Sequence, residues 1–126
     1  MVGGAVGAAA RYQLWRWWPD DIDEFPFTTF AINVMGCFAF GLLFGAVPAS
    51  AHGPIALVRP FLLFGVMSGF TTFSFFAVQG VTLTSPRVGV VYLLVTPILA
   101  VFAAWVGRTF AVALSGSASR ARKHVQ

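Results

Sequence analysis

Residues 65–76 read GVMSGFTTFSFF and lie at the centre of an apolar run that extends from about residue 60 to residue 81. A run of this length can cross the hydrocarbon core of a membrane as a helix, which takes about 20 residues. Glycine, serine and threonine form helices less readily than alanine or leucine, and they are concentrated in the middle of this run. Two interpretations remain open. The run is either a continuous helix that packs through small residues, or a broken helix whose free backbone groups line a cavity or bind an ion.

Three more apolar runs share the chain with this segment. They extend from about residue 2 to 18, from 27 to 47 and from 88 to 110, and short stretches with turn-forming residues connect them. The chain of 126 residues is 58% hydrophobic and 10% charged, whereas soluble domains are about 25% charged. We therefore predict an all-α integral membrane protein with four transmembrane helices in residues 1–114, followed by a basic, disordered tail in residues 115–126.

Charged residues are unevenly distributed along the chain. All four acidic residues lie between residues 20 and 24, where we expect a solvated loop. The tail carries Arg120, Arg122 and Lys123, and an even number of spans places it on the same side of the membrane as the N-terminus. Because Lys and Arg collect on the cytoplasmic side, we predict both termini in the cytoplasm. Beside membrane spans a basic tail indicates this sidedness, so we expect the lipid bilayer and no nucleic acid as a partner.

The four predicted spans contain no Asp, Glu, Lys or His. Proton-coupled pumps and exporters need an ionisable group within the membrane, because protonation of that group must change the affinity of the site. The composition therefore favours passive conduction or a purely structural role over a small multidrug exporter. It gives no indication of an enzyme.

Asn33 lies in the middle of the second apolar run, where an unpaired amide would be unfavourable, so its side chain must face protein or water. Two roles remain open for it. Asn33 shares a small, mildly polar helix face with Gly41, and this face would let another helix approach closely, as Gly45 would. Its NH2 group would equally serve as a hydrogen-bond donor to a passing anion.

Other candidate residues indicate an anion path only in combination. Phe73 and Phe76 share one helix face, and the edge of an aromatic ring is electropositive, although most such pairs contact only lipid or a neighbouring helix. Arg11 would either extend to the membrane interface or attract anions into a vestibule. Tyr92 and Thr96 are one helical turn apart and would form a track of hydroxyl groups.

Three motifs, taken together, resemble those of the Fluc/CrcB family of fluoride channels. Gly-Gly-Ala-Val-Gly-Ala at residues 3–8 precedes Arg-Tyr at residues 11–12, Thr-x-x-x-Asn-x-x-Gly occupies residues 29–36, and the third motif is the segment at residues 65–76. Their order and separations are similar to those of the family over most of the chain. The resemblance implies a broken third helix, a prokaryotic cell membrane, and two antiparallel chains with fluoride pores at their interface.

The resemblance also implies roles for particular residues. It implies a fluoride pore that is lined by Phe73, Phe76, Asn33, Ser74, Thr29, Tyr92, Thr96 and Arg11. It implies a structural sodium ion at the centre of the dimer, held by backbone carbonyl groups of Ser68 and Thr71 from both chains. Family members are either homodimers or pairs of related chains with fixed opposite orientations, and both arrangements remain open.

Three residues depart from the family pattern. Ser68 stands where the family has glycine, Phe75 where it has Thr or Ser, and Ala100 where it has a hydroxyl residue. A carbonyl ligand to sodium tolerates Ser68, but Phe75 and Ala100 remove hydrogen-bond donors and put conduction through one pore in question. We predict a fluoride channel subunit, with a non-conducting structural partner or a small multidrug exporter as the alternatives.

Overall fold

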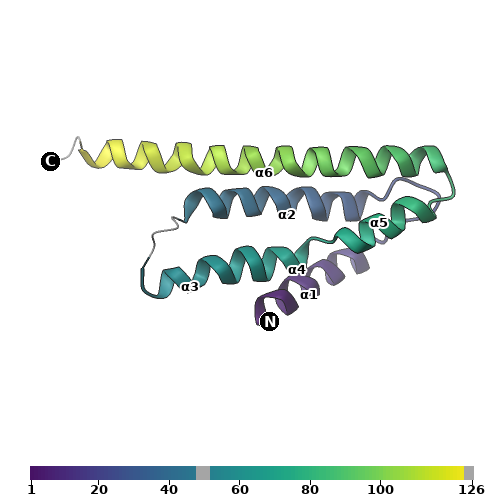
Figure 1. The fold of residues 1–126 in the computed structure, drawn as a ribbon, viewed down its shortest axis with the longest axis horizontal. Helices are drawn as coiled ribbons and strands as arrows, with labels where there is room; N and C mark the ends of the chain where they lie inside the picture. The colour runs from purple at the N-terminus through teal and green to yellow at the C-terminus, as the bar shows by residue number, and fades with distance from the viewer. Residues whose placement is uncertain (48–51, 124–126) are drawn as a thin grey trace.

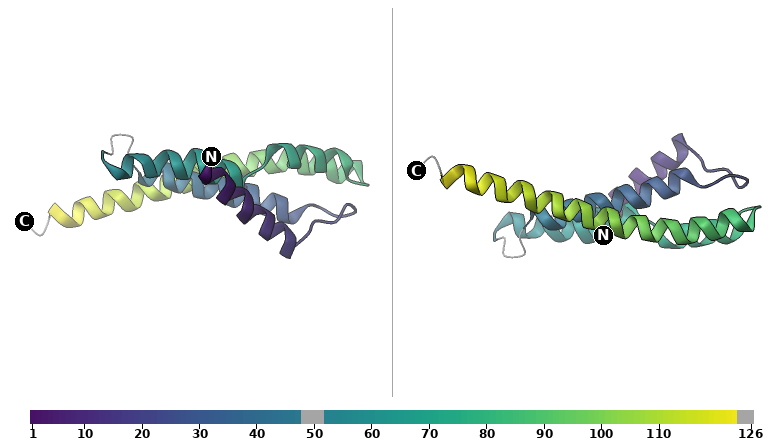
Figure 2. Two further views of the ribbon diagram at one scale, coloured as in Figure 1. Left: turned by 90° about the horizontal axis from the view of Figure 1, so that it is seen from below. Right: turned by 90° about the horizontal axis from the view of Figure 1, so that it is seen from above.

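The computed structural model describes residues 1–47 and 52–123, except for the side chains of residue 55 and residues 117–123. Every regular element within those ranges is helical, and none of them is a strand. The elements are α1 (Val2–Trp17), α2 (Phe27–Ala46), α3 (Pro54–Pro60), the π-helical segment η1 (Phe61–Met67), α4 (Ser68–Phe70), α5 (Phe73–Thr82) and α6 (Pro86–Lys123). They form an elongated bundle in which α2 lies beside α6, while α1 runs obliquely to both (Figure 1, Figure 2).

Three helical segments are long and apolar enough to cross a membrane: Phe27–Ala46, Ala56–Thr82 and Pro86–Gly116. The predicted all-helical membrane protein is confirmed at this level. The fourth predicted span corresponds to α1, which has 16 residues. At 1.5 Å per residue α1 is about 24 Å long, which is less than the hydrocarbon thickness of roughly 30 Å.

The C-terminal end of the chain differs from the prediction. Composition predicts a disordered tail from residue 115, whereas α6 continues as a helix to Lys123, and residues 124–126 lie outside the described part. The segment after Leu114 contains alanine, arginine and lysine, which favour helix, and no proline that would end it. Extending an existing helix is far easier than nucleating a new one, so Gly116 and the serines do not stop it.

Glycines bring the backbones of α2 and α6 into direct contact. A Cβ atom at Gly41 would overlap the carbonyl group of Ala104, and one at Gly107 would overlap the Phe38 carbonyl oxygen. Gly45 faces the backbone of α6 one turn further along. The close helix approach predicted for the Gly41 and Gly45 face is therefore confirmed.

α1 packs against η1 and α4 in a similar way. Gly7 of α1 faces the Val66 carbonyl oxygen, and Gly69 of α4 approaches the Gly4 carbonyl oxygen. Larger residues at either contact would push the two helices apart. The contact places the later residues of α1 beside the junction between α4 and α5.

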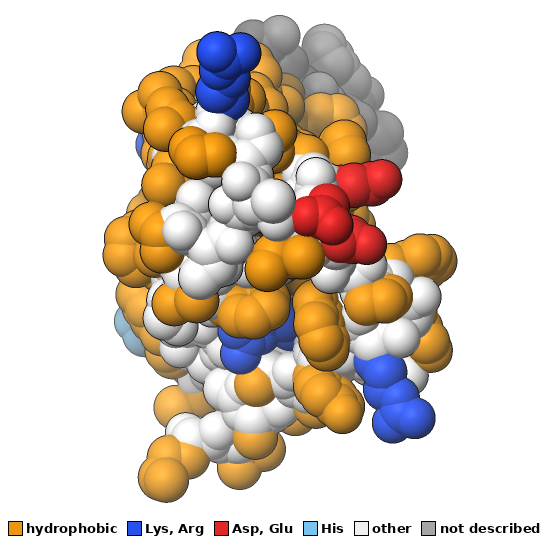
Figure 3. All heavy atoms as spheres, turned by 90° about the vertical axis from the view of Figure 1, so that its right-hand side faces the viewer, with side chains coloured by type: hydrophobic (Ala, Val, Ile, Leu, Met, Phe, Trp, Pro, Cys, Tyr) orange, Lys and Arg blue, Asp and Glu red, His pale blue; other side chains and the backbone are white. Residues whose placement is uncertain are grey.

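Little of the apolar surface is buried within the chain. Between 17 and 28% of the residues in the three apolar segments are buried. Hydrophobic side chains dominate the surface at the end of the molecule shown in Figure 3, where the acidic residues gather in one place. Such a surface is unfavourable in water and is suited to hydrocarbon or to a protein partner.

The glycine contacts predict the effect of a single methyl group. Gly41→Ala places a Cβ against the Ala104 backbone, and we expect the melting temperature of the purified protein in detergent to fall by several degrees. The reason is a steric overlap that outweighs the higher helix propensity of alanine, about 1 kcal/mol. Gly4→Ala is the matched control, because no atom lies within 4 Å of its Cβ. Equal melting temperatures for the two variants would contradict the packing.

Candidate functional site

Thr71 and Thr72 have extended backbone and separate α4 from α5 within an apolar segment. The Thr72 side chain caps α5, because its Oγ1 atom accepts a hydrogen bond from the Phe75 N–H at 3.2 Å. The backbone groups of an interrupted helix lose their usual partners, and hydrocarbon offers none in return. The candidate site is built around these freed groups.

Asn33 of α2 supplies partners to the backbone of Thr72. Its Nδ2 atom donates to the Thr72 carbonyl oxygen at 3.1 Å, and its Oδ1 atom accepts from the Thr72 N–H at 2.8 Å. Both residues are buried, with 7% and 8% of their surface exposed. The carboxamide has a second N–H, for which the described residues provide no acceptor. Asn33 is thus a link between two helical segments that retains one free donor.

The interruption also leaves the backbone carbonyl groups of residues 68–71 without their usual helical donors, and for two of them the redirected donor can be followed. In a continuous helix the Thr72 N–H would bond the Ser68 carbonyl and the Phe75 N–H would bond the Thr71 carbonyl. Here the Thr72 N–H donates to Asn33 and the Phe75 N–H donates to the Thr72 hydroxyl. The carbonyl oxygens of Ser68 and Thr71 are therefore available as ligands.

Ser68 and Thr71 lie on one side of the interruption, along a cavity of about 270 Å³. This cavity lies between α2 on one side and η1 and α4 on the other. Its other lining residues are Gly36, Cys37, Phe40, Leu63, Phe64 and Met67. The lining is apolar or weakly polar and has no charged side chain. The Thr71 hydroxyl donates to the Met67 carbonyl oxygen at 3.0 Å and is therefore engaged within the chain.

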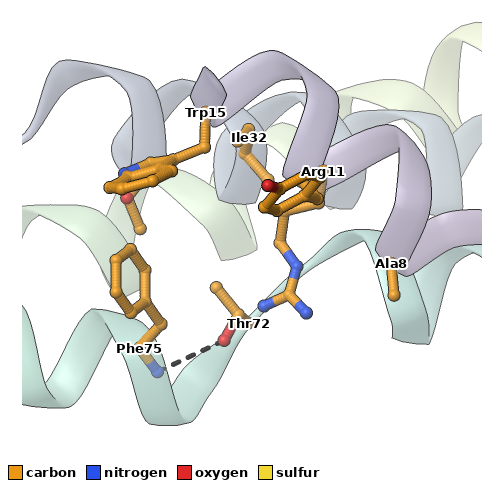
Figure 4. Close-up of a pocket in the computed structure, with 8 residues that line it drawn as sticks. Ala8, Arg11, Trp15, Ile32, Thr72 and Phe75 are labelled. Carbon is orange, nitrogen blue, oxygen red and sulfur yellow. Dashed lines mark hydrogen bonds between the residues drawn. The ribbon is translucent and has the colours of Figure 1, made fainter. Parts of the chain in front are cut away.

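A second cavity of about 220 Å³ lies between α1, α2 and α5. It is lined by Ala8, Arg11, Tyr12, Trp15, Thr29, Ile32, Thr72 and Phe75. In Figure 4 the Arg11 guanidinium group extends toward Thr72, and the Trp15 ring lies over Phe75, with ring centroids 6.1 Å apart at 87°. The described residues provide no carboxylate partner for Arg11, so its positive charge faces the cavity. The vestibule role of Arg11 stays a prediction.

The two phenylalanines of α5 have different surroundings. Phe76 is buried, with 6% of its surface exposed, and its ring centroid lies 5.0 Å from that of Tyr92. Phe73 is 81% exposed, although its ring centroid is only 5.9 Å from that of Phe76. Ser74 is also exposed, and its hydroxyl has no hydrogen-bond partner among the described residues. Phe73 and Ser74 therefore face lipid or a partner rather than a pore within this chain.

A chain of hydrogen bonds connects α6, α5 and α2. The Tyr92 hydroxyl donates to Gln79 Oε1 at 3.3 Å, and Gln79 Nε2 donates to Asp20 Oδ2 at 3.2 Å. The same oxygen accepts from the Thr29 hydroxyl at 2.6 Å and the Thr29 N–H at 3.0 Å, while Asp20 Oδ1 accepts from the Thr28 N–H at 2.7 Å. Thr29 and Tyr92 are 1% and 0% exposed. Two predicted pore residues are thus connected through two residues that were not predicted.

The expectation of a solvated loop is wrong for Asp20. This residue is half-buried and caps the N-terminus of α2, where free N–H groups and the helix dipole favour a carboxylate. The sequence contains one indication that Gln79 belongs to the site, since it is an amide one turn after Phe76 in an apolar run. It contains none for Asp20, because Gln79, its partner, is 59 positions away in sequence.

Thr96 follows Tyr92 by one turn of α6 and is 2% exposed. Its hydroxyl oxygen is buried and has no hydrogen-bond partner among the described residues. A buried hydroxyl without a partner is unusual, since leaving it unpaired costs about 1–3 kcal/mol. The predicted hydroxyl track therefore contains one group, Tyr92, that is engaged within the chain and one, Thr96, that is not.

Comparison with protein families finds one match, to the family described as CrcB-like protein, Camphor Resistance (CrcB), over residues 1–108. No solved structure matches the chain.

Several curated bacterial proteins are similar in sequence. The "Fluoride-specific ion channel FluC 1" of Streptomyces coelicolor is 43% identical over 107 residues, which are 82% of this chain and 69% of the relative. The "Fluoride-specific ion channel FluC 2" of Nocardia farcinica is 42% identical over 62% of this chain and 55% of its own length. A "Fluoride-specific ion channel FluC 2" of Rhodococcus jostii is 38% identical over 84% of this chain and 90% of its own length.

The link between Asn33 and Thr72 predicts a local effect of substitution. Asn33→Leu removes both partners of the Thr72 backbone, and we expect the amide hydrogens of residues 71–73 to exchange with solvent at least about tenfold faster, as a loss of roughly 1.4 kcal/mol implies. Hydrogen exchange of the protein in detergent, followed by mass spectrometry, measures this. Met35→Ala, an exposed position on the same helix, should leave the exchange unchanged. Equal protection in both variants would show that the link is not formed.

Proposed function

This chain belongs to the CrcB-like family, as the match over residues 1–108 shows, and we propose that it is a subunit of a fluoride-specific channel. The resemblance inferred from its motifs is thereby confirmed. The observation that carries the proposal is the interruption at Thr71 and Thr72, which collects neutral hydrogen-bond donors and aromatic rings inside an apolar bundle. The names of three relatives point to the same anion.

Passive flow explains why the apolar runs contain no Asp, Glu, Lys or His. Hydrogen fluoride crosses the membrane as a neutral molecule from acidic surroundings and dissociates in the neutral interior. The trapped anion then leaves through the channel, because the negative interior potential drives anions outward. The chain itself has only to replace part of the water around the ion, without binding it too tightly to release it.

Small donors and ring edges would perform that replacement. The free N–H of Asn33, the Thr29 and Tyr92 hydroxyls and the rim of the Phe76 ring are neutral groups that lie on α2, α5 and α6. A ring edge carries partial positive charge and holds an anion more weakly than a fixed cation does. Arg11 would raise the local anion concentration in the adjacent cavity.

We further propose that the pores form between two antiparallel chains, each with four membrane-crossing helices and a third helix interrupted at its centre. Phe73 and Ser74 support a partner, since both are exposed next to the buried Phe76. The short α1 ends at the exposed Trp17 and Trp18, side chains that suit the headgroup region and would let it serve as a fourth span. A homodimer and a pair of related chains both satisfy these observations.

The freed carbonyl groups of Ser68 and Thr71 suit a sodium ion. Sodium prefers oxygen ligands, and the carbonyl end of α4 carries partial negative charge. Side chains contribute little to such a site, so Ser68 in place of glycine does not disturb it. A second chain would supply the remaining ligands, and the ion would hold the two interrupted helices together.

A non-conducting partner subunit is the second candidate. Phe75 packs against Trp15 and offers no donor to the cavity, and the protons of Thr29 and Tyr92 are directed to acceptors within the chain. Fluoride efflux from liposomes that contain only this chain distinguishes the two candidates. A fluoride electrode should record rapid efflux with little chloride efflux, and the absence of fluoride efflux would contradict the channel.

Phe76→Ile tests the aromatic part of the site. The substitution keeps an apolar side chain but removes the ring edge, and we expect fluoride efflux to fall at least about tenfold while the protein assembles normally. Phe102→Ile is the matched control, because Phe102 is exposed on α6 and its ring lies beside that of Trp105. Assembly is followed by size-exclusion chromatography in detergent. Undiminished efflux in Phe76→Ile would remove this residue from the pore.

Removal of sodium tests the proposed cation site. We expect fluoride efflux to fall several-fold when sodium on both sides of the membrane is replaced by a large organic cation, because the carbonyl groups of Ser68 and Thr71 would then repel one another. Efflux should recover when sodium is returned. A channel that conducts fluoride equally well without sodium would contradict the site.

A further inference from the structure

We propose that Asp20 is a positioning residue that determines anion specificity, because it competes with the permeating ion for the Thr29 proton directly and for the Tyr92 proton through Gln79. This inference rests on the proposed fluoride channel and adds a residue to its site. It starts from the direction of the hydrogen-bond chain that joins α6, α5 and α2.

The carboxylate fixes this direction. An ionised carboxylate only accepts hydrogen bonds, so Gln79 must turn its NH2 group toward Asp20 Oδ2 and its carbonyl oxygen toward Tyr92. The Tyr92 proton then points at Gln79, and the Thr29 proton points at Asp20 over 2.6 Å. The Thr29 proton is therefore directed straight to Asp20 Oδ2, and the Tyr92 proton is directed to Gln79, which in turn donates to the same oxygen.

An anion can use the Thr29 proton only by replacing Asp20 as its acceptor, and the Tyr92 proton only by replacing Gln79, which Asp20 orients. Hydrogen bonds to a charged acceptor are about twice as strong as those to a neutral one, so only an anion that accepts hydrogen bonds strongly can take the Thr29 proton from Asp20. Fluoride is small, concentrates its charge and accepts hydrogen bonds strongly, whereas chloride is larger and accepts them weakly. The competition therefore admits fluoride and excludes chloride.

The surroundings of Asp20 allow this exchange. Asp20 lies in the connection between α1 and α2, and the two N–H groups of Thr28 and Thr29 hold its carboxylate when the side-chain protons are withdrawn. The unpartnered hydroxyl of Thr96 lies one turn beyond Tyr92 and offers the next buried donor along α6. An ion that has replaced Gln79 as the acceptor of the Tyr92 proton thus meets a hydroxyl that has no competing acceptor among the described residues.

The test compares anion selectivity in liposomes, with fluoride and chloride efflux measured for each variant. Asp20→Asn keeps an acceptor for the α2 N–H groups but removes the charge, and we expect the ratio of chloride to fluoride efflux to rise at least about tenfold, which corresponds to about 1.4 kcal/mol. Asp23→Asn makes the same charge change in the same connection, at an exposed side chain without a hydrogen bond, and should keep the ratio of the unmodified chain.

Gln79→Leu provides a second route, because it separates Tyr92 from Asp20 and leaves the cap of α2 intact. It should raise the same ratio even if Asp20→Asn does not fold. An unchanged ratio in Gln79→Leu, or in a folded Asp20→Asn, would overturn the inference, as would an equal rise in Asp23→Asn. Absence of fluoride efflux from the unmodified chain would instead overturn the proposed channel, before any variant is compared.

Discussion

Hydrocarbon offers no hydrogen bonds, so a helix that is interrupted inside a membrane must find partners for its backbone within the protein. In this chain the side chain of Asn33 pairs with both the N–H and the carbonyl group of Thr72. The pairing makes the interruption tolerable and takes the Thr72 N–H away from the Ser68 carbonyl, while the Thr72 hydroxyl takes the Phe75 N–H away from the Thr71 carbonyl. The Asn33 amide therefore stabilises the interruption and leaves the Ser68 carbonyl without its helical donor.

Close backbone packing gives that amide its position. The glycine contacts between α2 and α6, and those between α1 and α4, bring four helical segments near enough for short polar side chains to reach across. Thr29, Gln79 and Tyr92 connect only because α2, α5 and α6 approach so closely. The small residues thus bring the helices close together, and the polar residues form hydrogen bonds across these short distances.

Local patterns in the sequence predicted what depends on local physics. The lengths of the apolar runs gave α1 and α2 to within one residue, and a lone amide in an apolar run identified Asn33 as a buried, paired group. The tail after residue 115 was predicted wrongly, because its serine and glycine content was given more weight than the ease of extending α6. The role of Asp20 was missed because it depends on tertiary contacts that no local pattern contains.

The two-point pairing of Asn33 with Thr72 also constrains where chain length can vary. An inserted or deleted residue in a helix rotates everything beyond it by about 100°. Such a change between residue 33 and the end of α2, or between the start of η1 and Thr72, would turn one member of the pair, or the glycine faces beside it, away from its neighbour. Length differences among related chains should therefore gather in the connection between α2 and α3 and after residue 114, outside the segments that carry these contacts.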